Sequence, residues 1–191
     1  MKVYETNEIK NIALIGSKGS GKTTLAEAML YECGVIKRRG SVEAGNTVCD
    51  YFPVEKEYGY SVFSTVLNAE FLNKKLNVID CPGSDDFVGN AITALNVSDT
   101  GVILIDCQYG VEVGTQNIFR TTENLHKPVI FALNQLDGEK ADYDNVMAQM
   151  REDFGNKIVA VQFPTKCGAG FNSMIDVLLM KQYSWGPDGG V

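Results

Sequence analysis

The sequence is poor in the residues that metal sites and disulfide frameworks require. It has a single histidine, and its cysteines form no Cys-x-x-Cys pair. An odd number of cysteines without metal-ligand spacing argues against both a disulfide framework and a zinc site. We therefore expect most of the thiols to be reduced and buried. The five cysteines are Cys33, Cys49, Cys81, Cys107 and Cys167.

Long apolar runs are also missing. No segment approaches the roughly 18 uninterrupted apolar residues that a membrane-spanning helix needs. The opening stretch, Met1 to Glu8, lacks the pattern of a signal peptide. We therefore expect a cytoplasmic protein with no membrane partner. Its 191 residues are enough for one domain with a substantial core, and internal repeats and low-complexity tracts are absent.

Positive charge is in deficit as well. Lysine and arginine number 17 against 24 acidic residues, which gives a net charge of -7. A domain that holds nucleic acid by its own electrostatics is basic, so we expect little RNA binding and no DNA binding. The one dense basic run is Lys37 to Arg39, and it fits either a solvated loop or a contact with RNA or nucleotide.

The most informative feature that is present is a glycine-rich loop between a strand pattern and a helix pattern. The loop runs from Gly16 to Thr23, follows the apolar run Ile12 to Ile15, and opens the helical pattern Thr24 to Leu30. Its backbone N-H groups can cradle phosphate oxygens beside a helix N-terminus. The residues predicted to bind the nucleotide here are Gly16, Ser17, Lys18, Gly19, Ser20, Gly21, Lys22, Thr23 and Thr24.

Two side chains of this loop have specific predicted roles. Lys22 is expected to reach the β- and γ-phosphates, and the Thr23 hydroxyl to ligate Mg²⁺. The competing interpretation is a plain glycine turn between strand and helix, which the flanking patterns disfavour. The sequence therefore predicts a nucleoside triphosphate site.

A second predicted strand, Lys75 to Asp80, ends in a carboxylate and is followed by Cys81-Pro82-Gly83. Asp80 fits a Mg²⁺ ligand that acts through water, and Gly83 fits a backbone contact to the γ-phosphate. A strand followed by a proline-glycine turn is common by itself. Behind a phosphate loop, and with another strand from Val102 to Asp106 to follow, the functional interpretation is favoured.

A third predicted strand, Val129 to Leu133, ends in Asn134, Gln135 and Asp137. An aspartate there can accept hydrogen bonds from the ring N-H and the exocyclic amine of guanine, a pair that adenine does not offer. Asn134 is expected to tie the loop together. The alternative is a polar turn, because Asp-Gly is a strong turn signal. The position behind a phosphate loop favours guanine.

These motifs make the chain resemble the GTP-binding domain of translational GTPases, and elongation factor G most closely, in particular its divergent paralogues. Further matches are Asp50 to Val62 with the first switch, Gly110 to Gln116 with the turn before the third helix, and Phe163-Pro164 and Asp176 to Tyr183 with the start of the insert of elongation factor G. The resemblance implies GTP or GDP and Mg²⁺ as ligands, Ser61 as a further metal ligand, and the ribosome as partner in protein biosynthesis.

The chain departs from the family at several site positions. Ser84 stands where the family usually carries a histidine that orients the attacking water and where divergent paralogues can carry tyrosine. The one histidine, His126, lies at the end of a predicted helix before the strand that leads to the base loop. A serine hydroxyl is a poor proton carrier near neutral pH. Tyr58 stands where the family has an arginine before the glycine of the first switch, and Gln135 where it has a lysine that packs over the base plane. With Ser84, Lys22 and Gly83 as the catalytic set that the resemblance implies, we expect very slow hydrolysis.

Three functions follow from this resemblance. The first is a translocation factor with weak, ribosome-stimulated GTP hydrolysis. The second is a switch that acts through GTP occupancy without significant hydrolysis. The third is a ribosome-protection or recycling factor. A small-molecule kinase is disfavoured, because such kinases need neither the Asn134 to Asp137 loop nor the turn at Asp80 to Gly83.

The expected fold is α/β, a P-loop NTPase with a mainly parallel sheet and helices on both faces. We expect a GTP-binding domain over 1–157 and the start of the insert over 158–191, truncated before the last helix, as in the N-terminal part of a larger factor. The stretch Ile36 to Tyr60 is expected to be a long irregular loop. Strands are predicted at 9–15, 62–71, 75–80, 102–106, 129–133 and 158–162. Helices are predicted at 23–33, 85–96, 115–126, 142–154 and 171–179.

Overall fold

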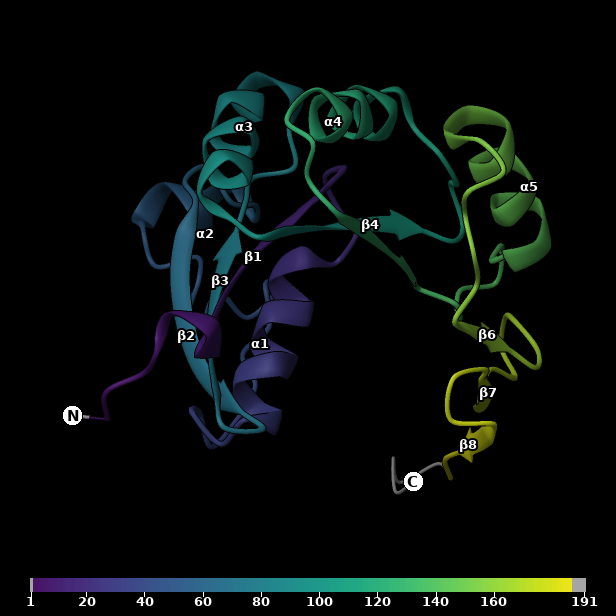
Figure 1. Ribbon diagram of the computed structural model, residues 1–191, viewed down its shortest axis with the longest axis horizontal. Helices are drawn as coiled ribbons and strands as arrows, with labels where there is room; N and C mark the ends of the chain where they lie inside the picture. Colours follow the sequence, from purple (N-terminus) through teal and green to yellow (C-terminus); the bar gives the residue numbers. More distant parts are fainter. Residues whose placement is uncertain (1, 187–191) are drawn as a thin grey trace. The chain divides into compact units, whose positions relative to one another are not determined.

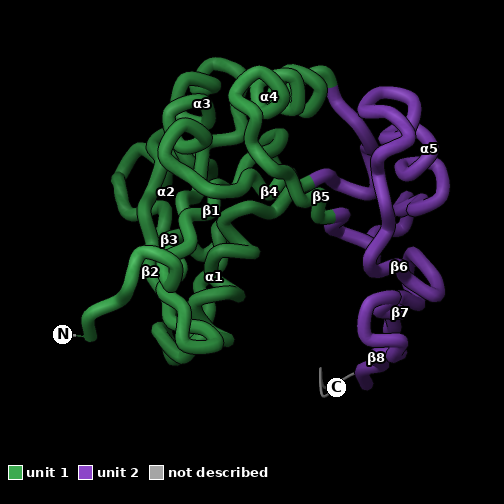
Figure 2. Tube along the Cα trace, in the orientation of Figure 1, with its two compact units in different colours: residues 1–104, 113–132 green, residues 105–112, 133–191 purple. Residues whose placement is uncertain are grey.

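The computed structural model describes residues 2–186. The chain divides into two compact units, coloured separately in Figure 2. Unit 1 comprises residues 1–104 and 113–132, and unit 2 comprises residues 105–112 and 133–191. The part of the expected insert at residues 187–191 lies outside the described residues, and the assignment of 158–191 to that insert stays a prediction.

The main sheet has five strands in the order β2-β3-β1-β4-β5. At its centre, β1 (Ile9–Gly16) pairs in parallel with β3 (Lys74–Asp80) and with β4 (Thr100–Asp106). The edge strand β2 (Thr65–Phe71) runs antiparallel to β3, and β5 (Val129–Asn134) is the other edge. This arrangement confirms a mainly parallel sheet.

Helices of unit 1 cover both faces of this sheet (Figure 1). Helix α1 (Lys22–Glu32) packs against β1, β2 and β3, while α3 (Val88–Val97) and α4 (Val113–Asn124) pack against β1 from the other side. Single 3-10 turns precede β1 at Thr6–Glu8 and α3 at Asp85–Phe87. The expected fold class is confirmed, and the carboxyl ends of β1 and β3 place the phosphate loop beside the turn after Asp80.

The core of unit 1 forms where the apolar strands meet α1. Leu14, Ala26, Leu30, Val78 and Leu104 are all at most 3% exposed and belong to one packed cluster. Strands that are buried on both faces read as continuous apolar runs, as the sequences of β1 and β4 do. This packing fixes the strand ends from which the site loops start.

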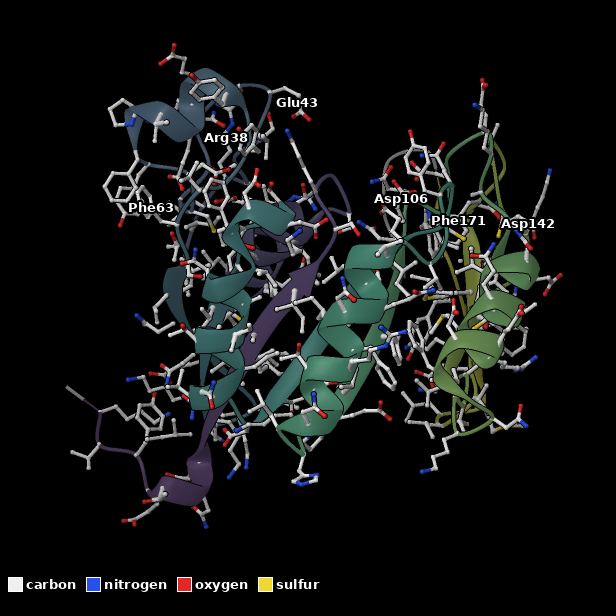
Figure 3. All side chains as sticks on the ribbon, turned by 90° about the horizontal axis from the view of Figure 1, so that it is seen from above. Arg38, Glu43, Phe63, Asp106, Asp142 and Phe171 are labelled. Atoms are coloured by element: carbon white, nitrogen blue, oxygen red, sulfur yellow. The ribbon has the colours of Figure 1, made fainter. Side chains whose placement is uncertain are left out.

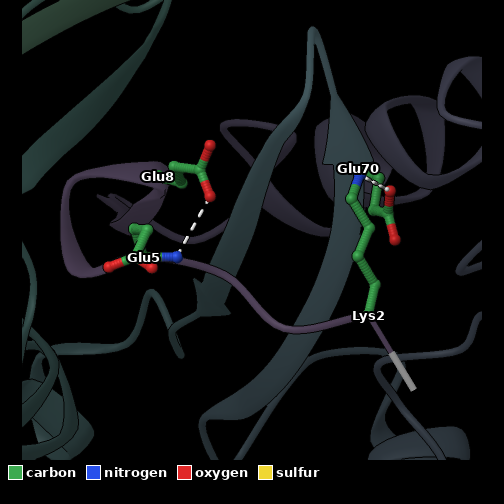
Figure 4. Close-up of polar contacts among 4 residues, drawn as sticks. All are labelled: Lys2, Glu5, Glu8 and Glu70. Atoms are coloured by element: carbon green, nitrogen blue, oxygen red, sulfur yellow. Dashed lines mark hydrogen bonds and ion pairs between the residues drawn. The ribbon is translucent and has the colours of Figure 1, made fainter.

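A tight two-residue turn joins β2 to β3. Phe71 pairs with Lys74, and the two residues between them, Leu72 and Asn73, have φ of 48° and 61°. Two consecutive positive φ values match the twist that a two-residue hairpin requires. Near this edge, the Lys2 ammonium lies 2.9 Å from a Glu70 carboxylate oxygen (Figure 4).

The segment from Ile36 to Tyr60 is less irregular than expected. It contains a short helix, α2 (Pro53–Tyr58), which begins with proline and ends at Gly59 with φ of 67°. The Glu55 side chain accepts a hydrogen bond from the backbone N-H of Phe52 at 3.2 Å. Proline at the first position, a glutamate at the third and a left-handed glycine are ordinary helix boundary signals, so this helix was predictable.

Unit 2 is built on α5 (Tyr143–Phe154) and a small antiparallel sheet. The Asp142 carboxylate caps α5 by accepting from the Asn145 N-H at 3.0 Å. The small sheet consists of β6 (Gln162–Pro164), β7 (Ser173–Asp176) and β8 (Lys181–Ser184). Two predictions are wrong here. The helix at 171–179 is replaced by β7 and a turn, and the strand at 158–162 is displaced to β6.

Candidate nucleotide and metal site

The loop between β1 and α1 has the backbone that a phosphate loop needs. Gly16, Gly19 and Gly21 have φ of 138°, 83° and 94°, a region that side chains other than glycine rarely adopt. A Cβ atom on Gly16 would also overlap the backbone carbonyl of Leu104. Because Gly21 is the residue before α1, the loop feeds directly into the helix N-terminus. The sequence has glycine at each position where this backbone requires it.

The Lys22 side chain lies buried beneath this loop, with 6% of it exposed. Its ammonium donates hydrogen bonds to the backbone carbonyls of Gly16 and Ser17 at 2.9 and 2.7 Å. Gly83 approaches the same ammonium so closely that a Cβ atom there would overlap it, and would lie 2.7 Å from the Lys18 backbone nitrogen. The structure thus brings together Lys22, Gly83 and the phosphate loop.

Three predicted metal-binding residues meet beside Lys22. The Thr23 hydroxyl donates to Asp80 Oδ2 at 2.7 Å and lies 3.2 Å from the Ser61 hydroxyl. The Ser61 hydroxyl donates to Asp50 Oδ1 at 2.7 Å. Asp50 belongs to the first switch but has no role predicted from sequence, because its contact with Ser61 is made only after the segment folds back. The four side chains form one hydrogen-bonded chain of hard oxygen atoms.

This cluster fits Mg²⁺. The Asp80 side chain is 1% exposed, and its Oδ1 atom accepts no hydrogen bond from an N-H or O-H group within residues 2–186. Burial raises the pKa of Asp80 to about 6, although the Thr23 hydroxyl, the Lys22 charge and the Cys49 thiol each lower it. A buried carboxylate oxygen without a donor is costly unless a cation compensates it. Hydroxyl and carboxylate oxygens are the ligands that Mg²⁺ prefers.

Buried carboxylates hold residues 36–63 in place, a segment that includes the Asp50 to Val62 match and that we call the first switch from here on. Glu27 of α1 is 1% exposed and accepts from the backbone N-H groups of Gly40 and Val48. Glu55 of α2 is equally buried and accepts from Val62 and Phe63, at 3.0 and 3.1 Å. Figure 3 shows Arg38 and Glu43 on this segment. No local sequence pattern predicts the Glu27 contacts, since they join residues 13 and 21 positions apart.

The phosphate loop and the first switch enclose a cavity of about 240 Å³. This volume is below the roughly 300 Å³ at which pockets for complete drug-sized ligands begin, and it suits a chain of phosphates better than a whole nucleotide. Thr24 also lines it. The other lining residues are Lys18, Gly19, Gly21, Lys22, Thr23, Val42, Glu43, Asp50, Gly59, Tyr60, Ser61 and Gly83.

Ser84 does not line that cavity in the described structure. It lines a separate pocket of about 20 Å³ with Gly83 and Ser17. Its hydroxyl lies 3.5 Å from Asp86 Oδ2, at the long limit of a hydrogen bond. His126, with φ of 53°, lies between α4 and β5, before the amino end of a strand. Of the predicted catalytic residues, the structure brings together Lys22 and Gly83, and leaves Ser84 at the margin.

The predicted base loop lies in unit 2, where backbone contacts shape it. Asn134 ends β5, and its carbonyl accepts from the Cys107 N-H at 2.9 Å. Gln135 has φ of 57°, and its side chain accepts from Gln108 Nε2 at 3.0 Å. The resemblance assigns Gln135 a place over the base plane, and the bond to Gln108 is an additional constraint on it.

The rest of the base loop presents Asp137 to solvent. Asp137 is exposed, whereas the preceding residue, Leu136, is 7% exposed. The Leu136 carbonyl accepts from the Gly168 N-H at 2.8 Å, and the Gly138 N-H donates to the Gln135 carbonyl at 3.1 Å. The loop is therefore a hydrogen-bonded turn with its carboxylate outward, which leaves that carboxylate accessible to a base.

The two cysteines nearest Asp80 have unreactive thiols. Cys81 is fully buried, and burial raises the pKa of its thiol to about 12. Burial likewise raises the pKa of Cys49, whose neighbour Asp80 adds to the effect. Because the thiolate is the reactive form, both thiols are inert at neutral pH. All five cysteines are free thiols.

A family model for the elongation factor Tu GTP-binding domain matches residues 7–183. The chain belongs to this family. Among residues 2–186, no helix of this family member is long and apolar enough to span a membrane.

Relatives of this GTP-binding domain are translation factors by name. An elongation factor G-like protein of Thermotoga maritima is 36% identical over 94% of the chain and 26% of its own length. Elongation factor G of Petrotoga mobilis is 30% identical over 99% and 27%. A mitochondrial ribosome-releasing factor 2 of Candida dubliniensis is 32% identical over 94% and 23%. The chain spans about a quarter of the length of these curated relatives.

A solved structure agrees with this assignment. A crystal structure of a Thermus thermophilus protein superposes with a TM-score of 0.88 at 34% identity, over 94% of this chain and 27% of the other. The chain is thus a GTPase domain like that of elongation factor G, with a P-loop fold.

Proposed function

We propose that this domain is the GTP- and Mg²⁺-dependent switch of a translation factor like elongation factor G that acts on the ribosome. The observation that carries the proposal is the Thr23, Ser61 and Asp80 cluster. Within residues 2–186 the buried Asp80 Oδ1 atom has no N-H or O-H donor, and the hydroxyl-bearing residues Thr23 and Ser61 line the phosphate cavity. The names of the relatives support the ribosome as the partner.

Each residue proposed to bind nucleotide or metal has a role that its chemistry suits. The phosphate-loop N-H groups and the Lys22 ammonium bind the phosphates, with Gly83 against the terminal one. Thr23 and Ser61 would supply hydroxyl ligands to Mg²⁺, and Asp80 would hold it through a water molecule. Bound there, Mg²⁺ would supply positive charge that offsets the negative charge of the phosphates. Asp137, with Asn134 and Gln135 in its loop, selects guanine.

Hydrolysis by this domain is proposed to be slow. Ser84 carries a short hydroxyl of unsuitable pKa where a proton carrier and water-orienting group is needed. Its hydroxyl makes the long contact to Asp86. In related enzymes, unassisted rates are near 10⁻⁴ per second, and assisting groups add a factor of about 10³ to 10⁵. Binding is therefore expected to be retained while turnover is weak.

Calorimetry tests the binding part of the proposal. The chain is titrated with GDP, a non-hydrolysable GTP analogue and the matching ATP analogue, each with and without Mg²⁺. The proposal predicts binding of both guanine nucleotides, Mg²⁺-dependent tightening for the GTP analogue, and weaker binding of the ATP analogue. Binding of neither guanine nucleotide at millimolar excess would contradict it.

A further inference from the structure

The phosphate loop carries a second lysine, Lys18, four residues before Lys22. Its backbone nitrogen faces Gly83, since a Cβ atom on that glycine would lie 2.7 Å away. Its side chain is exposed and lines the phosphate cavity. Lys18 therefore contributes to the wall of the cavity at the place where the phosphate loop meets residues 80–86, the segment from the end of β3 that we call the second switch.

The Lys18 ammonium lies against an aromatic ring of the first switch. Its nitrogen is 3.6 Å from the centroid of the Tyr60 ring, well inside the roughly 6 Å limit for a cation-π contact. Tyr60 directly precedes Ser61, whose hydroxyl lies 3.2 Å from that of Thr23. The ring of Tyr58 is 6.0 Å from that of Tyr60. Lys18 is thus joined to the segment that carries a metal ligand.

An aromatic partner has a different effect on a cation than a carboxylate partner has. A carboxylate would cancel the charge of the ammonium, whereas a ring face holds the ammonium and leaves its net charge intact. In residues 2–186 the Lys18 ammonium forms no ion pair. Asp50 and Glu43 also line the cavity, but Asp50 Oδ1 accepts from Ser61, and neither carboxylate forms an ion pair with Lys18 in the described structure. The arrangement keeps a positive charge at the cavity in addition to that of Lys22.

We propose that Lys18 and Tyr60 form a clamp that recognises the third, terminal phosphate of GTP. The Lys18 ammonium pairs with this phosphate, and Tyr60 is a positioning residue whose ring holds the ammonium there. GDP has no group for this ammonium, so the clamp favours GTP over GDP and couples that preference to closure of the first switch. This inference rests on the proposed guanine nucleotide site.

The test is the ratio of affinities for a non-hydrolysable GTP analogue and for GDP, both with Mg²⁺, measured by calorimetry on the full chain. Lys18→Met removes a charge-assisted hydrogen bond to the third phosphate, so it is expected to lower the affinity for the analogue by about 10- to 100-fold relative to the affinity for GDP. Lys18→Arg retains most of the ratio, because arginine keeps both the charge and the cation-π contact. Lys10→Met is the matched control, since it removes one exposed lysine of β1 before the strand reaches the loop.

Tyr60 variants test the positioning role independently of the charge. Tyr60→Leu is expected to lower the ratio by about 3- to 10-fold. Tyr60→Phe is expected to keep the ratio of the unmodified chain, because phenylalanine retains the ring face that holds the ammonium. The Lys18 contribution is also expected to shrink at high salt, as exposed charges are screened. Circular dichroism melts show whether each variant is folded before its affinities are compared.

The outcomes separate the clamp from the nucleotide site. If the unmodified chain binds both nucleotides and Lys18→Met leaves their ratio unchanged, the clamp is wrong and the site stands. An equal loss for GDP and the analogue also overturns the clamp, because it removes the preference for the third phosphate. If the unmodified chain binds neither nucleotide, both proposals fail. A selective loss in Lys18→Met, with retention in Lys18→Arg and Tyr60→Phe, supports the clamp.

Discussion

The two switches of this domain differ in how firmly their side chains are held. In the first switch, Asp50 and Ser61 are bonded to each other, and Glu55 accepts three backbone N-H groups. In the second switch, Ser84 has one long contact to Asp86. The groups proposed to bind metal are thus fixed by several hydrogen bonds, whereas Ser84, at the position proposed for water activation, is a weakly anchored hydroxyl. This difference supports the proposal that binding and turnover are separable in this domain.

Thr23→Val gives the largest expected effect on the binding side of this comparison. Valine keeps the shape but removes the hydroxyl that donates to Asp80 and neighbours Ser61. Losing a bond to a charged group together with a metal ligand suggests a fall of about 100-fold or more in Mg²⁺-dependent affinity for the GTP analogue. Thr93→Val on the exposed surface of α3 is the control. Equal affinities with and without Mg²⁺ in the unmodified chain would contradict the metal site.

Glu55→Ala tests whether the first switch depends on its buried carboxylate. The change leaves the backbone N-H groups of Phe52, Val62 and Phe63 without their acceptor. We expect a loss of about 3 kcal/mol in the free energy of unfolding, which is roughly 6 to 12 °C in Tm for a chain of this size. Glu57→Ala, an exposed neighbour on α2, serves as the control. A change in Tm no larger than that of the control would show that the carboxylate is not needed.

The pH dependence of stability tests the burial of the Asp80 carboxylate, which begins the second switch. The folded pKa of Asp80, about 6, lies above its unfolded value of 3.8. The folded state therefore binds more protons between these values, and ligand-free stability falls as pH rises from about 4 to about 6. The fall attributable to Asp80 is at most about 3 kcal/mol. Urea unfolding at several pH values measures this fall, and Asp80→Asn is expected to flatten the plot of unfolding free energy against pH. The same slope in Asp80→Asn as in the unmodified chain would contradict a raised pKa of Asp80.

Cysteine labelling gives the smallest expected effect and reports on both switches at once. Cys49 belongs to the first switch and Cys81 follows Asp80, and both are at most 1% exposed. In Glu55→Ala, local opening of the first switch is expected to speed labelling of Cys49 by about tenfold, with Cys81 unchanged. Mass spectrometry after alkylation measures the two sites separately. Equal acceleration at both cysteines would mean that the variant unfolds globally and that the switches are not independent.

Local patterns of the sequence predict much of the fold. The buried runs of β1, β3 and β4 and the helices α1 and α5 lie within two residues of the predicted bounds. The region 171–179 shows the limit. Its apolar residues fit a helix, but pairing of Phe163 with Ile175 and of Met174 with Tyr183 makes β7 a strand. Such pairing between distant residues overrides local propensity.

In the candidate site, too, local patterns predict some residues, and contacts between distant residues determine the rest. The roles of Thr23 and Asp80 are suggested by motif positions, since Thr23 comes at the end of the glycine-rich loop and Asp80 ends a strand, and that of Ser61 by the resemblance of its segment. The contacts of Glu27 with Gly40 and Val48, and of Lys18 with Tyr60, depend on how the first switch folds back over α1 and the phosphate loop. No periodicity or spacing encodes a contact of this kind. Sequence therefore predicts the groups that we propose to reach the phosphates, while the structure is needed to see what holds them.

Single-turnover GTP hydrolysis tests the separation of binding from turnover most directly. The unmodified chain and Ser84→His are loaded with GTP and Mg²⁺, and phosphate release is followed with and without ribosomes. If the two are separable, the unmodified chain stays near the unassisted rate of about 10⁻⁴ per second, Ser84→His is faster, and both bind the GTP analogue equally well. Turnover by the unmodified chain at about 1 per second or above would contradict that separation.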